Sequence, residues 1–231
     1  CGHTGLESPA KLGKFIYSHK VTNRHQEKDI RVNLFIPSIL SWKEEGVELI
    51  QQSRIPESEQ VDLTLNLKKK QKLILRIRKP DWTDKATFII NGEEEQPLLG
   101  SDGYWIIDRV WERKNVITLR LPMHIYTENL TGTDRYVALL YGPYVLAGHM
   151  GKENLPTTFW GKMNNTAMNK MDMAKVPVFR EPVERIPTHV EVVSGEPLKF
   201  GINLKGFEHI VLEPFYKVHF ERYAVYWPIT H

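Results

Sequence analysis

The chain lacks the features that mark several common protein classes. Its 231 residues include one cysteine, Cys1, which excludes an intrachain disulfide. No apolar run approaches the roughly 18 residues that a membrane-spanning helix needs, so we expect no transmembrane segment. Lysine and arginine number 31 against 28 acidic residues, a net charge of +3, so we expect no nucleic-acid partner. The sequence also contains no Ser–His–acid arrangement, phosphate-binding loop or paired-cysteine metal motif.

Most of the sequence has the pattern of β-strands. Apolar and polar residues alternate over residues 61–67, 73–78 and 117–121, which is typical of strands buried on one face. Asn91-Gly92 and Ser101-Asp102-Gly103 indicate tight turns between strands. Short strands with such turns predict a mostly β fold of antiparallel β-sandwich or jelly-roll domains.

The N-terminal segment alone has a helical pattern. Ser8 suits an N-cap, and Pro9 suits the first helical position. Apolar residues then recur close to every 3.6 residues from Leu6 to Tyr17. We therefore expect a helix here, followed by a polar loop from Ser18 to Asp29.

The pattern divides the chain into four segments. They are the helix and loop (residues 1–28), a β-sandwich domain (29–149), an irregular segment rich in proline and methionine (150–187), and strands that complete a sandwich or form a small second β domain (188–231). Methionine side chains fill irregular gaps, so we expect the third segment to pack against another surface.

The residues by themselves offer few candidate sites, and none is assigned a catalytic role. Asp102 and the pair Glu221-Arg222 are interpreted as solvated or salt-bridged structural residues. His3 lies near a turn and is interpreted as polar surface. Most of the six tryptophans are assigned to the core or its rim, and Trp160 is the best candidate for contacting a carbohydrate.

Several strings together resemble the C-terminal part of glycoside hydrolase family 127 (GH127), the β-L-arabinofuranosidase family. The pattern Cys-x-x-Thr-Gly-x-Glu at residues 1–7 resembles the junction that closes the family's catalytic barrel. Val137-Ala138-Leu139-Leu140-Tyr141-Gly142-Pro143 is the most specific match. The other similar strings are residues 32–38, 102–111, 116–123 and 214–227.

The resemblance implies a longer parent protein with an (α/α)₆ catalytic barrel followed by β-sandwich domains. Residues 1–28 are then the remnant of the last barrel helix and its loop. Hydrolysis in the family is retaining and uses a cysteine nucleophile held on zinc, with a glutamate as general acid/base. Cys1 matches a zinc-ligand position, a role expected only in the intact parent. We expect the chain alone to be inactive and to need no cofactor.

The implied parent is an exported bacterial hydrolase of the Bacteroides type. It would act, in the periplasm or outside the cell, on β-linked L-arabinofuranose in plant glycans. The expected partners of this chain are the N-terminal barrel and an arabinose-containing glycan. Two alternatives stay open. One is a stand-alone carbohydrate-binding β-sandwich, and the other is a surface protein lipid-anchored through Cys1.

Overall fold

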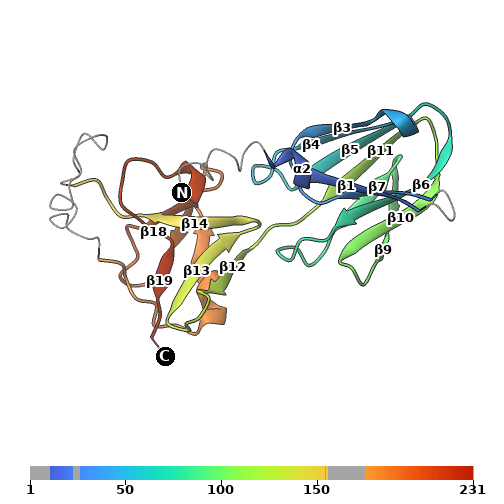
Figure 1. The fold of residues 1–231 in the computed structure, drawn as a ribbon. Helices are drawn as coiled ribbons and strands as arrows, with labels where there is room; N and C mark the ends of the chain where they lie inside the picture. The colour runs from blue at the N-terminus through green and yellow to red at the C-terminus, as the bar shows by residue number, and fades with distance from the viewer. Residues whose placement is uncertain (1–10, 23–26, 154, 156–174, 231) are drawn as a thin grey trace. The chain divides into compact units, whose positions relative to one another are not determined.

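The computed structural model describes residues 11–22, 27–153, 155 and 175–230, and the chain forms two compact units (Figure 1). Unit 1 is Cys1–Met123 and unit 2 is His124–His231. This division differs from the predicted boundary at residue 149. The reason is that the strands before residue 149 pair with strands close to the C-terminus.

Unit 1 is a sandwich of two β-sheets around one apolar core (Figure 1). Sheet A has the order β1 (Tyr17–Thr22), β2 (Glu27–Val32), β6 (Gln71–Arg78), β10 (Tyr104–Trp111) and β9 (Leu98–Leu99). Sheet B has the order β3 (Ser38–Trp42), β4 (Val47–Ser53), β5 (Gln60–Leu67), β11 (Lys114–Arg120), β7 (Thr87–Ile90) and β8 (Glu93–Glu95). The 3-10 helix η1 (Lys43–Glu45) joins β3 to β4. Neighbouring strands are antiparallel except for the parallel pair β2–β6.

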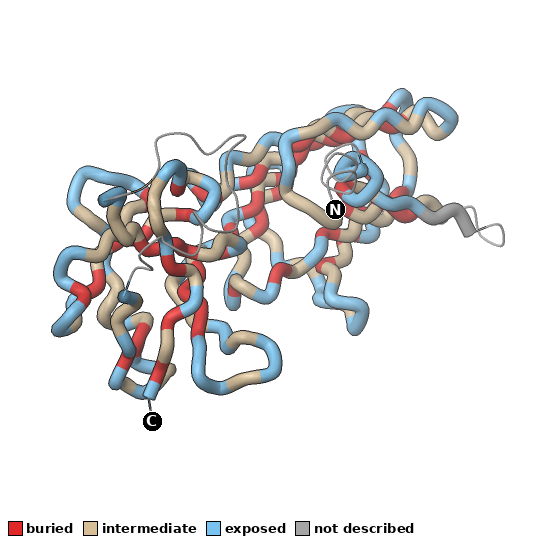
Figure 2. The backbone as a smooth tube through the Cα atoms, turned by 60° about the vertical axis from the view of Figure 1, so that its left-hand side comes forward, coloured by how far each residue is buried: buried red, intermediate tan, exposed pale blue. Residues whose placement is uncertain are grey.

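The inner faces of the two sheets carry the apolar residues that the two-residue period predicted. Every second residue of β5, from Val61 to Leu67, is buried, and the same alternation runs along other strands of the unit (Figure 2). Phe88 of sheet B meets Trp105 of sheet A with ring centroids 5.0 Å apart. Each fully buried side chain of this size stabilises the fold by roughly 1.5–3 kcal/mol. Burial between the sheets therefore holds unit 1 together.

The predicted N-terminal helix is confirmed over Gly13–Ile16, which form helix α2, and residues 1–10 lie outside the described ranges. The predicted polar loop is wrong in its described part. Tyr17 already belongs to β1, and most of the predicted loop forms the antiparallel pair β1–β2. Ile30 of β2 is fully buried, so the backbone around it needs hydrogen-bonding partners, and β1 supplies one of them. Strand pairing thus occurs where the polar sequence predicted a loop.

The predicted turns are confirmed. Asn91 and Gly92 join β7 to β8 with φ values of 52° and 92°, the left-handed region that a two-residue hairpin of this type requires. The Asn91 side chain also accepts a hydrogen bond of 2.9 Å from the backbone N–H of Val116. Gly103, with φ of 78°, closes the turn that precedes β10.

Unit 2 is built on eight strands. Its path is β12 (Ile125–Asn129), β13 (Tyr136–Tyr141), β14 (Tyr144–His149), β17 (Val211–Pro214), β16 (Phe200–Ile202) and β15 (Val190–Val192). In addition, β18 (Tyr223–Ala224) pairs with β14, and β19 (Tyr226–Pro228) pairs with β13. Two 3-10 helices, η2 (Val183–His189) and η3 (Phe215–Lys217), complete the described part.

The described end of the predicted irregular segment packs into the core of unit 2. Phe179 and Ile186 are fully buried, and Phe179 stacks on Phe207 with centroids 4.4 Å apart. Trp227 lies 5.9 Å from both phenylalanine rings. Four of the methionines that suggested packing lie outside the described residues: Met163, Met168, Met171 and Met173.

Gly148 of β14 lies directly against the buried Trp227 ring. A Cβ atom added at Gly148 would come within 2.5 Å of Trp227 Cη2. Because the core leaves no room, we expect Gly148→Ala to destabilise unit 2 by about 1–3 kcal/mol in urea unfolding.

Gly201→Ala is the matched control, because a Cβ atom there meets nothing within 4 Å. Gly201 lies in β16 and has no positive φ. Its alanine variant should be neutral or gain about 0.4–1 kcal/mol through a less flexible unfolded chain. Equal losses in the two variants would contradict the close approach of Gly148 to Trp227.

Candidate functional site

The residues assigned to sites from the sequence lie outside the described ranges. Cys1, His3 and Trp160 fall there, so their roles stay predictions. Among the described residues, no group of three or more His, Cys, Asp or Glu side chains could hold a metal ion. No helix in the described ranges is long and apolar enough to cross a membrane.

The described tryptophans belong to the core or its rim, as predicted. Trp105, Trp111 and Trp227 are buried. Trp42 and Trp82 are half-buried and pack against the core of unit 1. The Trp111 indole donates a hydrogen bond of 2.9 Å to the carbonyl oxygen of Leu73, which satisfies its polar atom inside the sandwich.

Asp102 belongs to a charged network on the outer face of sheet A, formed by Asp29, Arg31, Arg76 and Asp102. The Arg76 guanidinium lies 2.7 Å from Asp29 and 3.5 Å from Asp102. Arg31 lies 3.6 Å from Asp102 and stacks over the Tyr104 ring at 5.2 Å. Each carboxylate thus has a guanidinium partner. This fits the predicted structural role of Asp102.

Glu221 is one of two carboxylates that flank His149 at the end of β14. Nδ1 of His149 lies 2.6 Å from Glu221 Oε1, and Nε2 lies 3.1 Å from Glu213 Oε2. The side chains of Glu213 and Glu221 are only 14% and 11% exposed. We call these three residues the His149 cluster, which links β14 to β17 and to the segment before β18.

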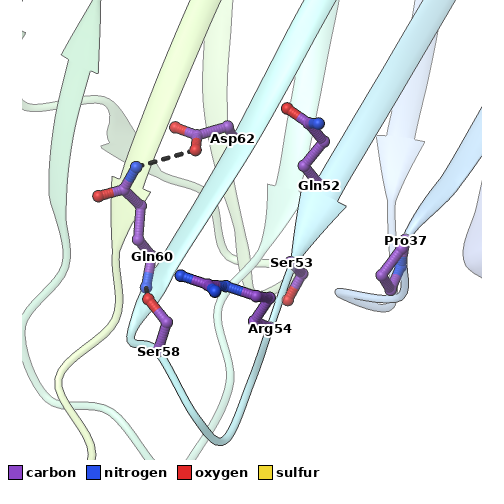
Figure 3. Close-up of a pocket in the computed structure, with 7 residues that line it drawn as sticks. All are labelled: Pro37, Gln52, Ser53, Arg54, Ser58, Gln60 and Asp62. Carbon is purple, nitrogen blue, oxygen red and sulfur yellow. Dashed lines mark hydrogen bonds between the residues drawn. The ribbon is translucent and has the colours of Figure 1, made fainter.

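One candidate for binding is a polar pocket at one end of sheet B, with a volume of about 470 Å³ (Figure 3). It lies where β4 ends and β5 begins. Six of its lining residues are polar and one is apolar; they are Pro37, Gln52, Ser53, Arg54, Ser58, Gln60 and Asp62. No sequence motif marks these residues. They converge because β4 and β5 are paired in register, with Gln52 opposite Asp62.

Hydrogen bonds fix the base of the polar pocket. Asp62 accepts 2.6 Å and 2.8 Å hydrogen bonds from Thr118 Oγ1 and Gln60 Nε2. Gln51 precedes the lining residue Gln52 and is buried. Its amide donates hydrogen bonds to the carbonyl oxygens of Leu34 and Ile36, which sets the position of the following Pro37. The pocket is therefore held in place by side chains from three strands.

Unit 2 exposes aromatic side chains that the search for tryptophans missed. Phe220 is 86% exposed and has a φ of 55°, which is unfavourable for a bulky residue. Phe215 and Tyr223, nearly half exposed, lie 4.9 Å apart between ring centroids. Their signal in the sequence was the aromatic content of residues 215–226.

Tyr17 and Glu208 are among the described groups whose pKa values are displaced by their surroundings. Burial raises the pKa of the Tyr17 phenol, and its 2.9 Å hydrogen bond with Ser38 partly opposes this. The folded protein therefore favours the neutral phenol, and its unfolding free energy falls as the pH rises above the unfolded-state pKa and through the folded-state pKa of Tyr17. A hydrogen bond from the Gly206 N–H lowers the pKa of the exposed Glu208. Neither group lines the polar pocket.

Both units match known sequence families. Residues 29–123 match the family described as "Beta-L-arabinofuranosidase, GH127 middle domain". Residues 126–229 match a domain of unknown function. The two matches meet close to the division after Met123. No curated protein matches the chain.

Solved structures share this fold. A GH127 β-L-arabinofuranosidase from Geobacillus stearothermophilus T6 is 25% identical with a TM-score of 0.52, over 61% of this chain and 22% of its own. A structure described as a glycoside hydrolase is 19% identical with a TM-score of 0.54, over 87% of this chain and 36% of its own. A GH127 β-arabinofuranosidase is 16% identical with a TM-score of 0.56, over 87% and 35%.

The chain thus has the β-sandwich fold of these solved structures, and the match of residues 29–123 relates it to glycoside hydrolases. More particularly, the chain is a GH127-like β-sandwich region. It spans 22% to 36% of the length of the solved chains that it matches.

The His149 cluster generates a stability prediction. Replacing His149 by glutamine removes the imidazole ring whose two nitrogens contact the two mostly buried carboxylates. We expect His149→Gln to lower the unfolding free energy of unit 2 by about 1–3 kcal/mol. His209→Gln is the control, since His209 is exposed, and it should change stability by less than about 0.5 kcal/mol. Similar effects of the two substitutions would argue against a structural role for the cluster.

Proposed function

We propose that this chain is the non-catalytic β-sandwich part of a glycoside hydrolase that resembles β-L-arabinofuranosidases. Its role is to support the catalytic (α/α)₆ barrel of the parent protein. The observation that carries the proposal is the match of residues 29–123 to the GH127 middle domain. The match of residues 126–229 follows directly and accounts for unit 2.

The side chains of the described units support a bracing role. Asp102, Glu213 and Glu221 each take part in ion pairs within their own unit. Each of these carboxylates is held by a partner within its own sandwich, which fits a structural role. The catalytic cysteine and the acid/base glutamate are assigned to the barrel of the parent. Cys1 is proposed as a zinc ligand only in that intact protein.

The proposed substrate of the parent is β-linked L-arabinofuranose in plant polysaccharides or glycoproteins. The match to a β-L-arabinofuranosidase middle domain and the likeness to the Geobacillus β-L-arabinofuranosidase support this substrate class. A parent that degrades plant glycans would work in the periplasm or outside the bacterial cell. This location follows from the family resemblance.

A stand-alone carbohydrate-binding β-sandwich is the second candidate function. The polar pocket of unit 1 and the exposed Phe220 of unit 2 favour it, because sugars bind through hydrogen bonds and through aromatic faces. Under this alternative the chain works without a barrel. Under the proposed function the chain is part of an enzyme.

The purified chain should not hydrolyse an aryl β-L-arabinofuranoside, even with added zinc and a thiol. The expected rate equals the blank, because the catalytic groups are assigned to the barrel. A GH127 β-L-arabinofuranosidase assayed in parallel shows that the substrate and conditions are sound. Turnover by the chain above the blank would overturn the proposal.

The codons upstream of Cys1 in the source gene separate the candidate functions. The proposal expects several hundred residues of helical-hairpin sequence that end in a second cysteine next to Cys1. A short signal peptide with a lipobox abutting Cys1 would replace the enzyme assignment with a lipid-anchored binding protein.

A further inference from the structure

We propose that the polar pocket of unit 1 binds a short, neutral saccharide. The proposal deepens the proposed function and rests on it only for the choice of sugar, L-arabinofuranose. The existence of the site is argued from its lining residues alone. Nothing in the family matches assigns a ligand to this end of the sandwich.

The dimensions and composition of the pocket suit a small polar ligand. Its volume of about 470 Å³ falls within the usual range for small-molecule sites. The lining contains no aromatic ring, and Pro37 is its one apolar residue. Binding would therefore rely on hydrogen bonds to hydroxyl groups rather than on stacking.

The pocket has hydrogen-bonding groups left over for a ligand. Within the described residues, the Arg54 guanidinium makes no ion pair or side-chain hydrogen bond, and it presents five N–H donors. Figure 3 shows it extending from the end of β4 toward the side of the pocket where Ser58 and Gln60 lie. The Ser58 hydroxyl oxygen accepts a hydrogen bond from the Gln60 backbone N–H, so its own proton stays available for donation.

The charge of the pocket favours a neutral ligand. Arg54 and Asp62 are the two charged residues of the lining, so their formal charges cancel. Both oxygens of Asp62 already accept hydrogen bonds, one from Thr118 and one from Gln60. An acidic sugar would approach this fixed carboxylate, and a cationic ligand would approach Arg54. The planar guanidinium and amide groups of the lining, together with its serine hydroxyls, can form hydrogen bonds with adjacent hydroxyl groups of a neutral sugar.

The pocket is preorganised by the sheet beneath it. Gln52 and Thr118 lie opposite Asp62 on its two neighbouring strands. The Ser58 N–H donates 3.0 Å to the Arg54 carbonyl oxygen, which closes the turn between β4 and β5. Glu59 of this turn is tied to the chain after β11, because its carbonyl oxygen accepts a 2.8 Å hydrogen bond from the Leu121 N–H. The backbone that carries the lining is thus ordered before a ligand binds, and the exposed Arg54 side chain becomes ordered on binding.

A second hollow on sheet B provides the internal control. Its volume is about 310 Å³, and it is lined in part by Ser41, Lys43, Glu48 and Asn66. The Asn66 amide donates 2.8 Å to Glu48, so part of its polar lining is already paired. Lys43→Gln removes one positive charge from this hollow, just as Arg54→Gln removes one from the polar pocket.

The test is a titration of the ¹⁵N-labelled 231-residue chain with methyl β-L-arabinofuranoside and with an arabinan-derived trisaccharide. We expect amide shifts at Arg54, Ser58 and Gln60, with a dissociation constant on the order of 1 mM. Arg54→Gln should weaken binding about tenfold, the equivalent of one charge-assisted hydrogen bond. Lys43→Gln should leave the affinity unchanged. Asp62→Asn, which keeps the shape of the side chain, should also weaken binding.

Thermal unfolding of each variant establishes that it is folded; Arg54 is exposed, so its replacement leaves the core intact. Four results would each overturn the proposal. They are no amide shifts, amide shifts confined to unit 2, a loss of affinity in Lys43→Gln equal to that in Arg54→Gln, and tighter binding of galacturonate than of the neutral sugars. The binding test is independent of the hydrolysis assay. Turnover by the chain would remove the proposed function and leave the saccharide site standing, whereas absent binding would remove the site alone.

Discussion

Apolar contact between the inner faces of sheets A and B is the interaction on which the rest of unit 1 depends. Once alternate residues such as Leu63 and Leu75 are fixed inward, their neighbours must point outward. This alternation places Asp62 in the base of the polar pocket and Arg76 in the charged network. The polar features of the unit are thus positioned by its apolar core.

Charged side chains link strands in both units. In unit 1, Arg31 and Arg76 bridge carboxylates on the outer face of sheet A; solvent weakens the pairs with Asp102, whereas the side chains of Arg76 and Asp29 are only 19% and 12% exposed. In unit 2, the similarly buried His149 cluster joins β14 to β17 and to the segment before β18. Unit 2 has short strands and a compact aromatic core around Trp227. Links of this kind between its strands supplement the stability that the core provides.

The sequence predicted what local pattern controls. The alternation over residues 61–67 and the Asn91-Gly92 turn depend on neighbours in the chain, and both were confirmed. The polar loop predicted from Ser18 was wrong because β1 is stabilised by its pairing with β2 rather than by its own periodicity. The domain boundary at residue 149 differed for a related reason, since β17, one of the partners of β14, lies more than sixty residues further along the chain.

The binding features were beyond prediction because they depend on strand register. Gln52 and Asp62 meet only because β4 and β5 pair in one particular alignment. His149 and its two carboxylates are separated by 64 and 72 residues, and no motif connects them. Among the aromatic residues, only tryptophans were predicted as sugar-binding candidates from the sequence. The exposed rings of unit 2 belong instead to phenylalanines and tyrosines such as Phe220 and Tyr223.

The edge strands of unit 1 determine where another chain can extend its sheets. At one edge of sheet B, β8 consists of the three glutamates Glu93–Glu95, whose like charges repel an incoming acidic strand and keep the edge hydrated. At the corresponding edge of sheet A, β9 has only two residues, too few to template a neighbour. The opposite edges, β1 and β3, have longer strands. Strand addition, and with it aggregation, is therefore directed to β1 and β3.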